Sequence, residues 1–373
     1  MNLVFDGASL RLARVFSGLA LEEVALRVGK TRQYLHKLEA NQGTPTAQLA
    51  QDLADALQVE AGFFAPKARH LHEDQFHFRK LLTTKATIKQ VAIARGEMVD
   101  ILIKYLDQEL HLPEINIPSV SQPNTYEDIE RAAEYCRKEW ELGLGPIDNM
   151  TRLAENLGAV VTTFNGISKD IDALSVSVER PFIVRNIAKE SACRHRFDIA
   201  HELGHLVMHD GLVTGDRITE SQANRFASAL LLPRSMMAKL FPRPNGTRLD
   251  WKGMKEFKLT WKVSKAAILY RARQLELITE SQYKTGVITL RKYGESNGEK
   301  DDYLIPQEPP EMMTKALLVL ATKKGMYPND LAKALHIKPA FLHELTGVDS
   351  APQPPDASHS SQTRPRHLRL VKS

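Results

Sequence analysis

The residues best suited to chemistry in this chain are two histidines and the glutamate between them. His201, Glu202 and His205 form the pattern H-E-x-x-H. On a helix, residues four apart lie on one face, so both imidazoles can hold one Zn²⁺ ion, and the glutamate can act as general base toward water. The alternative is a core helix with two incidental histidines. Gly204 favours the metal site. Glycine weakens a helix, and the close approach of another backbone or of a substrate would explain why it stands here.

A zinc site needs a third protein ligand, and the sequence offers Glu220. The metzincin continuation would place glycine at 208 and histidine at 211, where the chain has Met208 and Gly211, so that class is excluded. Glu220 begins a second predicted helix, and Asn224, one turn on, could hold a ligand imidazole through its second ring proton. His209 is one more turn along the first helix and is predicted to lie behind the ligands or in the core. The alternative role of Glu220 is that of a charge at a helix N-terminus.

The stretch before the H-E-x-x-H helix predicts the elements that position it. Apolar spacing predicts helices over 126–140 and 146–157. Three runs rich in β-branched residues follow, at 159–164, 173–178 and 181–185, and predict strands. We therefore expect a mostly α protein with a small antiparallel β-sheet, of the α+β class.

The first 66 residues predict five short helices that include a helix-turn-helix. Gly29 ends the second helix and Thr31 caps the third, which runs to Ala40. The residues expected to contact DNA are cationic or polar and lie at the end of the second helix, in the turn and in the third helix: Arg27, Lys30, Thr31, Arg32, Gln33, His36 and Lys37. The alternative is a helical domain for dimerisation or partner binding.

This segment resembles the λ-repressor-like (Xre) helix-turn-helix family. The resemblance rests on residues 22–25, Gly29, Thr31, Leu35, Leu38, Glu39 and Pro45. It implies that the third helix enters a major groove of DNA. Leu21 departs from the family pattern, in which a glutamine commonly begins the second helix and touches a phosphate.

A second resemblance covers residues 125–290. The chain resembles the ImmA/IrrE family of zinc metallopeptidases in residues 144–158, 196–205, 220–227 and 230–233. Members often carry a λ-repressor-like domain in front. The resemblance implies a minimal zincin-like fold of the gluzincin type, with Zn²⁺ held by His201, His205 and Glu220 and with Glu202 as catalytic base. It also implies cleavage of a repressor encoded nearby, in stress response, phage control or mobile-element control.

Composition narrows the class of protein. The 373 residues are 43% hydrophobic and 25% charged, as in globular proteins, and the net charge of +5 permits contact with nucleic acid without requiring it. Cys136 and Cys193 predict neither a disulfide framework nor a thiolate zinc site, and they fit a reducing cytoplasm. We expect no signal peptide and no membrane span.

Breaks in the pattern predict five segments. Histidines 70, 72 and 77 lack ligand-like spacing and predict no metal site, and we find no clear internal repeat. The segments are a helix-turn-helix domain (1–66), a helical linker (67–122), a zinc peptidase domain (123–290) with a helix-turn-helix-like tail (245–290), a helical C-terminal region (291–348) and a disordered basic tail (349–373).

Together these features predict a cytoplasmic zinc endopeptidase with a DNA-binding domain that cleaves a transcriptional repressor. The alternative is a DNA-binding regulator or toxin–antitoxin component whose peptidase fold acts as a sensor. The intact Glu202 favours the peptidase, because a sensor needs no general base. The expected partners are a protein substrate and DNA, and a homodimer is compatible with the helix-turn-helix. His195, Tyr270 and Arg271 are weak candidates for stabilising the oxyanion.

Overall fold

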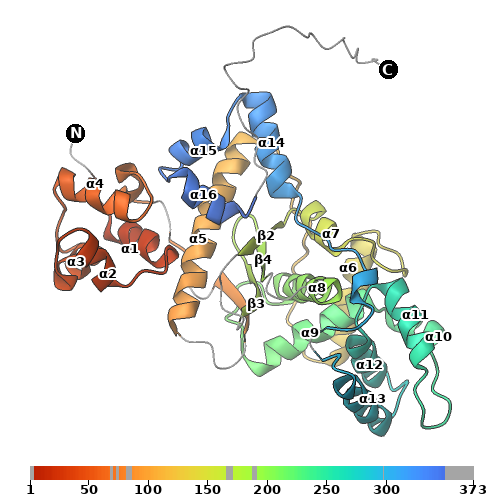
Figure 1. Cartoon of the computed structure of the whole chain (residues 1–373). Helices are drawn as coiled ribbons and strands as arrows, with labels where there is room; N and C mark the ends of the chain where they lie inside the picture. Colours follow the sequence, from red (N-terminus) through yellow and green to blue (C-terminus); the bar gives the residue numbers. More distant parts are fainter. Residues whose placement is uncertain are drawn as a thin grey trace, which may run out of the picture.

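The chain is mostly helical and contains one small sheet (Figure 1). The computed structural model describes residues 4–67, 70–72, 75–80, 86–164, 171–186, 191–296 and 298–348. The predicted tail 349–373 lies outside the described residues. The helix-turn-helix helices come first along the chain, and the sheet with its covering helices follows, so the predicted fold class is confirmed at this level.

The five predicted N-terminal helices are present, the last of them as a 3₁₀ turn. Gly29 takes the left-handed backbone conformation (φ 62°) that ends the second helix, and Thr31 accepts a hydrogen bond from the Tyr34 amide at 3.2 Å, as a helix cap does. The elements are α1 (Gly7–Phe16), α2 (Leu21–Arg27), α3 (Arg32–Glu39), α4 (Ala47–Ala56) and η1 (Ala61–Phe64).

The sheet has four strands in the order β1-β3-β4-β2 and is mixed, not antiparallel as predicted. Its strands are β1 (Phe76–Lys80), β2 (Val160–Phe164), β3 (Ile171–Val176) and β4 (Phe182–Asn186). Neighbours β1 and β3, and β3 and β4, are antiparallel, but β2 pairs with β4 in parallel. The prediction was wrong because β4 lies between β2 and β3, so β2 and β3, which are adjacent in sequence, are not partners.

The linker is not helical throughout, because β1 belongs to the sheet. Its helix is α5 (Ala86–Glu109), whereas Phe76–Lys80 pairs with β3, with Phe76 opposite Val176. Phe76 and His77, on opposite faces of the strand, are both buried. The prediction of a helical segment here was wrong, since the partner strand lies far along the chain and local periodicity does not reveal it.

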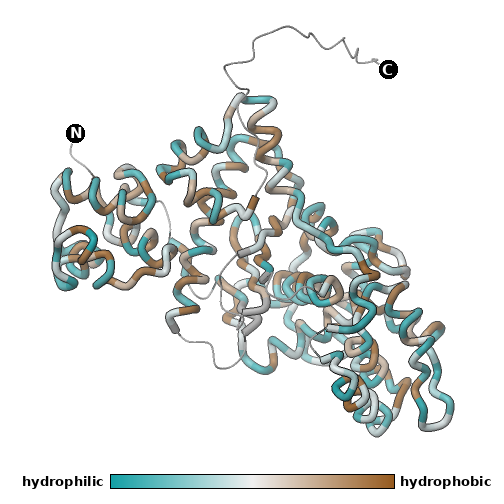
Figure 2. Tube along the Cα trace, viewed as in Figure 1, coloured by the Kyte–Doolittle hydropathy of each residue, from teal (hydrophilic) through white to brown (hydrophobic). Residues whose placement is uncertain are grey.

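Helices cover both faces of the sheet. Val160 and Val184 point to a core shared with α1, α5, α14 (Met312–Lys324) and α16 (Pro339–Thr346). Val161 and Ile183, their neighbours along the strands, point to a second core built by helices α6 to α13. Along the helices, hydrophobic and hydrophilic residues alternate, as amphipathic helices require (Figure 2). The helices around this second core are α6 (Tyr126–Glu139), α7 (Met150–Asn156), α8 (Ala192–Met208), α9 (Arg217–Leu231), α10 (Arg234–Leu240), α11 (Trp251–Trp261), α12 (Lys265–Gln274) and α13 (Glu280–Lys292).

The C-terminal helices repeat the geometry of the helix-turn-helix, a repeat that the sequence did not reveal. Helices α2 and α3 have 7 and 8 residues, and so do α15 (Pro328–Ala334) and α16. Their connections, 28–31 and 335–338, are equally long and turn through a left-handed residue, Gly29 in one and His336 (φ 55°) in the other. Helices α15 and α16 thus match α2 and α3 in length, in the length of their connection and in its left-handed second residue.

The second pair of helices packs against α1 and the end of α4, and not against α2 and α3, as far as the described residues show. The rings of Phe16 in α1 and Phe341 in α16 stack with 4.0 Å between their centroids. Val59 and Ile337 form a β-bridge, and Lys338 pairs with Asp55 at 2.6 Å. These contacts tie the two ends of the described chain together and leave α3 on the outside (Figure 1).

Candidate metal centre

Helix α8 carries the H-E-x-x-H residues through the middle of the molecule. It begins at Ser191, whose hydroxyl accepts from the Arg194 amide, and apolar residues surround it. His201, Glu202 and His205 are all 0% exposed. A buried helix of this kind holds both imidazoles on one face with little freedom to move.

Helix α9 brings the third candidate ligand to the same place. Asp216 caps the helix through the amides of Ile218 and Thr219, which sets Glu220 in the first turn. The Glu220 carboxylate lies 3.4 Å from Nε2 of His201 and 3.3 Å from Nε2 of His205. One ligand atom from each of the three residues lies within 4.8 Å of the others.

Hydrogen bonds behind the histidines fix which ring nitrogen faces Glu220. Gln222 donates its amide to the Pro123 carbonyl, so its oxygen accepts from Nε2 of His209 at 2.8 Å. Nδ1 of His209 is then an acceptor, and Nδ1 of His205 donates to it at 2.9 Å. Since each neutral imidazole has one N–H, Nε2 of His205 keeps its lone pair for a ligand.

Asn224 does the same for the other histidine. Its side-chain oxygen lies 3.0 Å from Nδ1 of His201, which therefore donates and leaves Nε2 as an acceptor. The two Nε2 atoms are 3.1 Å apart. Two lone pairs and a carboxylate at these distances repel one another, and a cation among them would relieve that repulsion. The donor set, two imidazoles and one carboxylate with an open fourth position, fits Zn²⁺.

The electrostatics keep these groups in the forms that bind metal. Burial lowers the pKa of His205 to about 4, so its imidazole is neutral at pH 7. Burial alone would raise the pKa of Glu220, but the two histidine rings beside its carboxylate outweigh burial and keep the pKa low, at about 2. A neutral imidazole and an ionised carboxylate are both ready to act as ligands.

A residue of the sheet contacts Glu202, the candidate base. Ser175 of β3 donates its hydroxyl to the Glu202 carboxylate at 2.5 Å. Sequence reasoning missed Ser175, because an alternating strand pattern predicts a serine facing solvent, whereas α8 covers that face and Ser175 is buried.

Sequence reasoning also missed His77, which it treated as an exposed or packed residue. The His77 ring lies parallel to that of His205, with 5.2 Å between centroids, and its Nδ1 bonds Thr214 at 2.8 Å. His77 is 1% exposed. No spacing rule could have found it, since β1 reaches the site only by pairing with β3.

The weak oxyanion candidates do not join this cluster. Arg271 is buried in a paired ion bridge with Glu130, at 2.6 and 2.7 Å, and Tyr270 lies beside Tyr283. His195 lines a separate cavity at the other end of α8.

All the predicted DNA contacts are exposed: Arg27, Lys30, Thr31, Arg32, Gln33, His36 and Lys37. Arg32 pairs with Glu22 at 2.7 Å, and Arg27 donates to the Ala56 carbonyl at 3.2 Å. An exposed ion pair of this kind contributes little and leaves Arg32 able to turn to a phosphate. The surface of α3 is thus open to a partner.

Comparison with known proteins agrees with both parts of this description. The helix-turn-helix pattern matches residues 10–64, and the IrrE N-terminal-like pattern, Peptidase_M78, matches residues 154–273. No curated protein matches the chain. Within the described part of the chain, no helix has the length and apolar character needed to cross a membrane. With its buried His-His-Glu cluster inside the second match, the chain thus joins a helix-turn-helix domain to an IrrE N-terminal-like domain of the Peptidase_M78 family.

Proposed function

We propose that the chain is a zinc-dependent endopeptidase with a DNA-binding domain, and that it cleaves a transcriptional repressor or a similar regulator. The observation that carries the proposal is the convergence of His201, His205 and Glu220 beside Glu202 within a Peptidase_M78 domain. A group of three metal-ligating side chains, with a carboxylate base one residue from a ligand, suits metal-assisted hydrolysis.

The proposed roles follow from the geometry. His201, His205 and Glu220 would hold the ion, and Asn224 and His209 would orient the two imidazoles. Bound zinc would supply Lewis-acid chemistry toward water and the scissile carbonyl. Glu202 would take a proton from the attacking water and return it to the leaving amine, while Ser175 positions its carboxylate.

The helix-turn-helix domain suggests where the substrate is found. We propose that α3 enters the major groove with Arg32, Gln33, His36 and Lys37, supported by Arg27 at the end of α2 and by Lys30 and Thr31 in the turn. A peptidase held at an operator meets the repressor bound there, and this supports a repressor encoded nearby as substrate, in stress response or mobile-element control. The free, buried Cys136 and Cys193 fit a reducing cytoplasm. A homodimer would match a two-fold symmetric operator.

We propose that the peptidase unit spans 123–290, with 245–290 as its helical tail. We also propose that β1, which lies in the linker 67–122, belongs to the sheet of this unit. Pairing of β1 with β3 supports this addition. The helix-turn-helix domain would be 1–66, and the region 291–348 would brace it through α15 and α16.

Metal content and one substitution test the proposal. The purified full chain should contain about one zinc per molecule and should cleave the repressor encoded beside its own gene. Glu202→Gln should keep the zinc and lose at least about a hundredfold in cleavage rate, because it removes the proton acceptor alone. Glu256→Gln, an exposed change of the same kind on α11, is the matched control and should cleave normally.

Two outcomes contradict the proposal. One is pure protein that binds no zinc even when zinc is supplied. The other is a Glu202→Gln variant that cleaves the repressor, or releases its target genes, as well as the wild type.

One observation favours a second candidate, a regulator or toxin–antitoxin component whose peptidase fold senses a partner. Glu202 is 0% exposed and already accepts the Ser175 hydroxyl, so a peptide does not reach it in this conformation. A sensor predicts that Glu202→Gln leaves gene control intact while His201→Ala, which removes a metal ligand, abolishes it. The endopeptidase predicts that both variants fail.

A further inference from the structure

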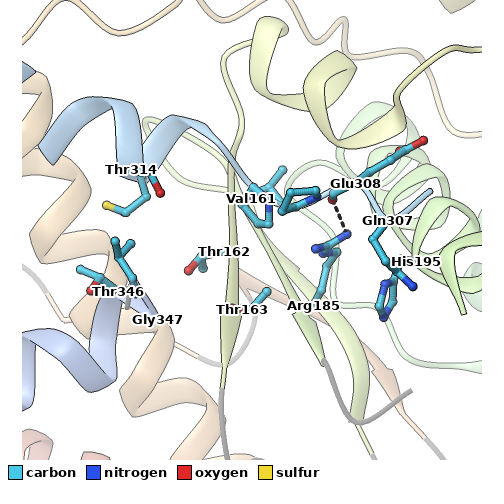
Figure 3. Close-up of a pocket in the computed structure, with 14 residues that line it drawn as sticks. Val161, Thr162, Thr163, Arg185, His195, Gln307, Glu308, Thr314, Thr346 and Gly347 are labelled. Carbon is cyan, nitrogen blue, oxygen red and sulfur yellow. Dashed lines mark hydrogen bonds between the residues drawn. The ribbon is translucent and has the colours of Figure 1, made fainter. Parts of the chain in front are cut away.

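A cavity lies apart from the metal centre, between the sheet and the C-terminal helices. Its volume is about 480 Å³, within the range of small-molecule sites. Strand β2 forms its floor, α14 and the end of α16 form one wall, and Arg185, His195 and the 307–310 segment form the other (Figure 3). Its apolar lining comes chiefly from Val161, Pro309, Met313 and Val348.

Arg185, on β4, is a charged side chain of this lining. It makes no ion pair with any acidic residue that the structure describes. It is 5% exposed. Its Nη1 donates to the Glu308 carbonyl at 3.1 Å and to the Thr151 hydroxyl at 3.4 Å (Figure 3). Its Nε and Nη2 make no hydrogen bond to any residue that the structure describes. Nε is fully buried, so Nη2 is the donor of this guanidinium that remains for a ligand.

Glu308 lines the same cavity but does not neutralise Arg185. Its carboxylate is engaged by Arg196 and by the amides of Met150 and Thr151. Only its carbonyl oxygen reaches Arg185. The guanidinium thus has no direct ion pair with a described residue, and burial lowers the pKa of Arg185 to about 10 although Glu308 and Glu155 raise it in part.

Other buried arginines of the chain show what Arg185 lacks. Arg271 makes two parallel bonds to the Glu130 carboxylate. Arg137 has no acidic partner, but it donates to three carbonyl oxygens, those of Gly143, Leu230 and Gly145. A buried charge with unused donors is costly to a fold, and an anion arriving from outside would remove that cost.

We propose that this cavity binds a small monocarboxylate with an apolar body, its carboxylate on Nη2 of Arg185 and its body against Met313 and Val348. A single negative charge matches one cation that makes no direct ion pair. A phosphate dianion suits the site less well, because the charges of Glu155 and Glu308 also act on Arg185. The ligand would touch α8 through His195 and α16 through Thr346, so it would join the peptidase helix to the helices that brace the DNA-binding domain.

The test uses 4-phenylbutanoate as probe, titrated calorimetrically into the full chain. The acid should bind with one molecule per chain, and 4-phenylbutan-1-ol, which has the same body without the charge, should bind at least about tenfold more weakly. Arg185→Gln should weaken binding of the acid by at least about tenfold and leave binding of the alcohol unchanged.

A second pair of variants keeps Arg185 in place. Thr314 is exposed and lines the cavity, so Thr314→Trp should fill it and abolish binding. Thr322→Trp, an exposed change on the same helix away from the cavity, should bind as the wild type does. The proposal is overturned if the acid shows no saturable binding, if the alcohol binds equally well, if Thr314→Trp binds like Thr322→Trp, or if inorganic phosphate alone binds as tightly as the acid.

Discussion

The imidazoles of His77 and His205 lie face to face, with 3° between their planes and 5.2 Å between their centroids. His77 belongs to β1 and His205 to α8, so the segment that follows the helix-turn-helix domain forms one wall of the candidate metal centre. A change in the position of β1 would move the ring that stacks on His205.

We expect His77→Ala to weaken zinc binding by about tenfold, because residues that support a ligand imidazole typically contribute 10–100-fold to metal affinity. Competition with a chromophoric chelator measures the effect. His77→Phe should recover most of the affinity, since it restores the stacked ring. His72→Ala is the control, because His72 is an exposed linker histidine. Equal affinities for His77→Ala and wild type would show that the stack does not support the ligand.

Asn224→Ala should weaken zinc binding by about 10–100-fold. The substitution removes the oxygen that accepts from Nδ1 of His201 and so frees the imidazole to take the wrong tautomer. The same chelator competition measures it, with Ser221→Ala, an exposed change on the same helix, as control. Asn224→Asp, which keeps an acceptor, should bind zinc close to normally. An Asn224→Ala variant with unchanged affinity would contradict the proposed orienting role.

The sequence was informative where the signal is local. The spacing of His201 and His205 on one helix, the cap at Thr31 and the turn at Gly29 all depend on residues a few positions apart, and the structure has each of them. Glu220 could also be predicted, because the loop between α8 and α9 is short and brings these two neighbouring helices together.

The parts that sequence reasoning missed depend on pairing across the chain. β1 has five residues and gains its hydrogen bonds only from β3, and β2 pairs with β4 and not with its sequence neighbour. Ser175 lies against Glu202 and His77 lies against His205. The alternation of residues within one strand does not predict such contacts with another element.

Gly204 provides a test of the packing between α8 and α9. A Cβ there would lie 2.9 Å from Cδ1 of Phe226, closer than side chains tolerate. Gly204→Ala should therefore destabilise the protein by about 1–3 kcal/mol through overpacking, against a gain of about 1 kcal/mol in helix propensity. Urea unfolding measures the difference, and Phe226→Leu in the same chain should restore part of it. A Gly204→Ala variant more stable than wild type would rule out the clash.

DNA binding should depend on α3 and not on general positive charge. Arg32→Ala with Lys37→Ala should lower affinity for the operon's own promoter and reduce the salt dependence of binding by about two ion equivalents, one for each lost phosphate contact. Gel shifts over a range of salt concentrations measure both. Lys323→Ala with Lys333→Ala removes two exposed charges from α14 and α15 and should leave binding unchanged. Equal losses in the two double variants would mean that α3 is not the recognition helix.

The two matching pairs of helices offer a matched pair of substitutions, because Tyr34 in α3 and Phe341 in α16 hold equivalent positions. Tyr34 is 38% exposed, whereas Phe341 is 3% exposed and stacks on Phe16. Phe341→Ala should therefore destabilise the protein by about 3–5 kcal/mol, the usual cost of truncating a buried phenylalanine. Tyr34→Ala should change stability by less than about 0.5 kcal/mol, as surface substitutions do, and should instead weaken DNA binding. Urea unfolding and gel shifts of both variants distinguish the roles. If Phe341→Ala proved harmless to stability, the second pair would not be the brace that its contacts with α1 and α4 indicate.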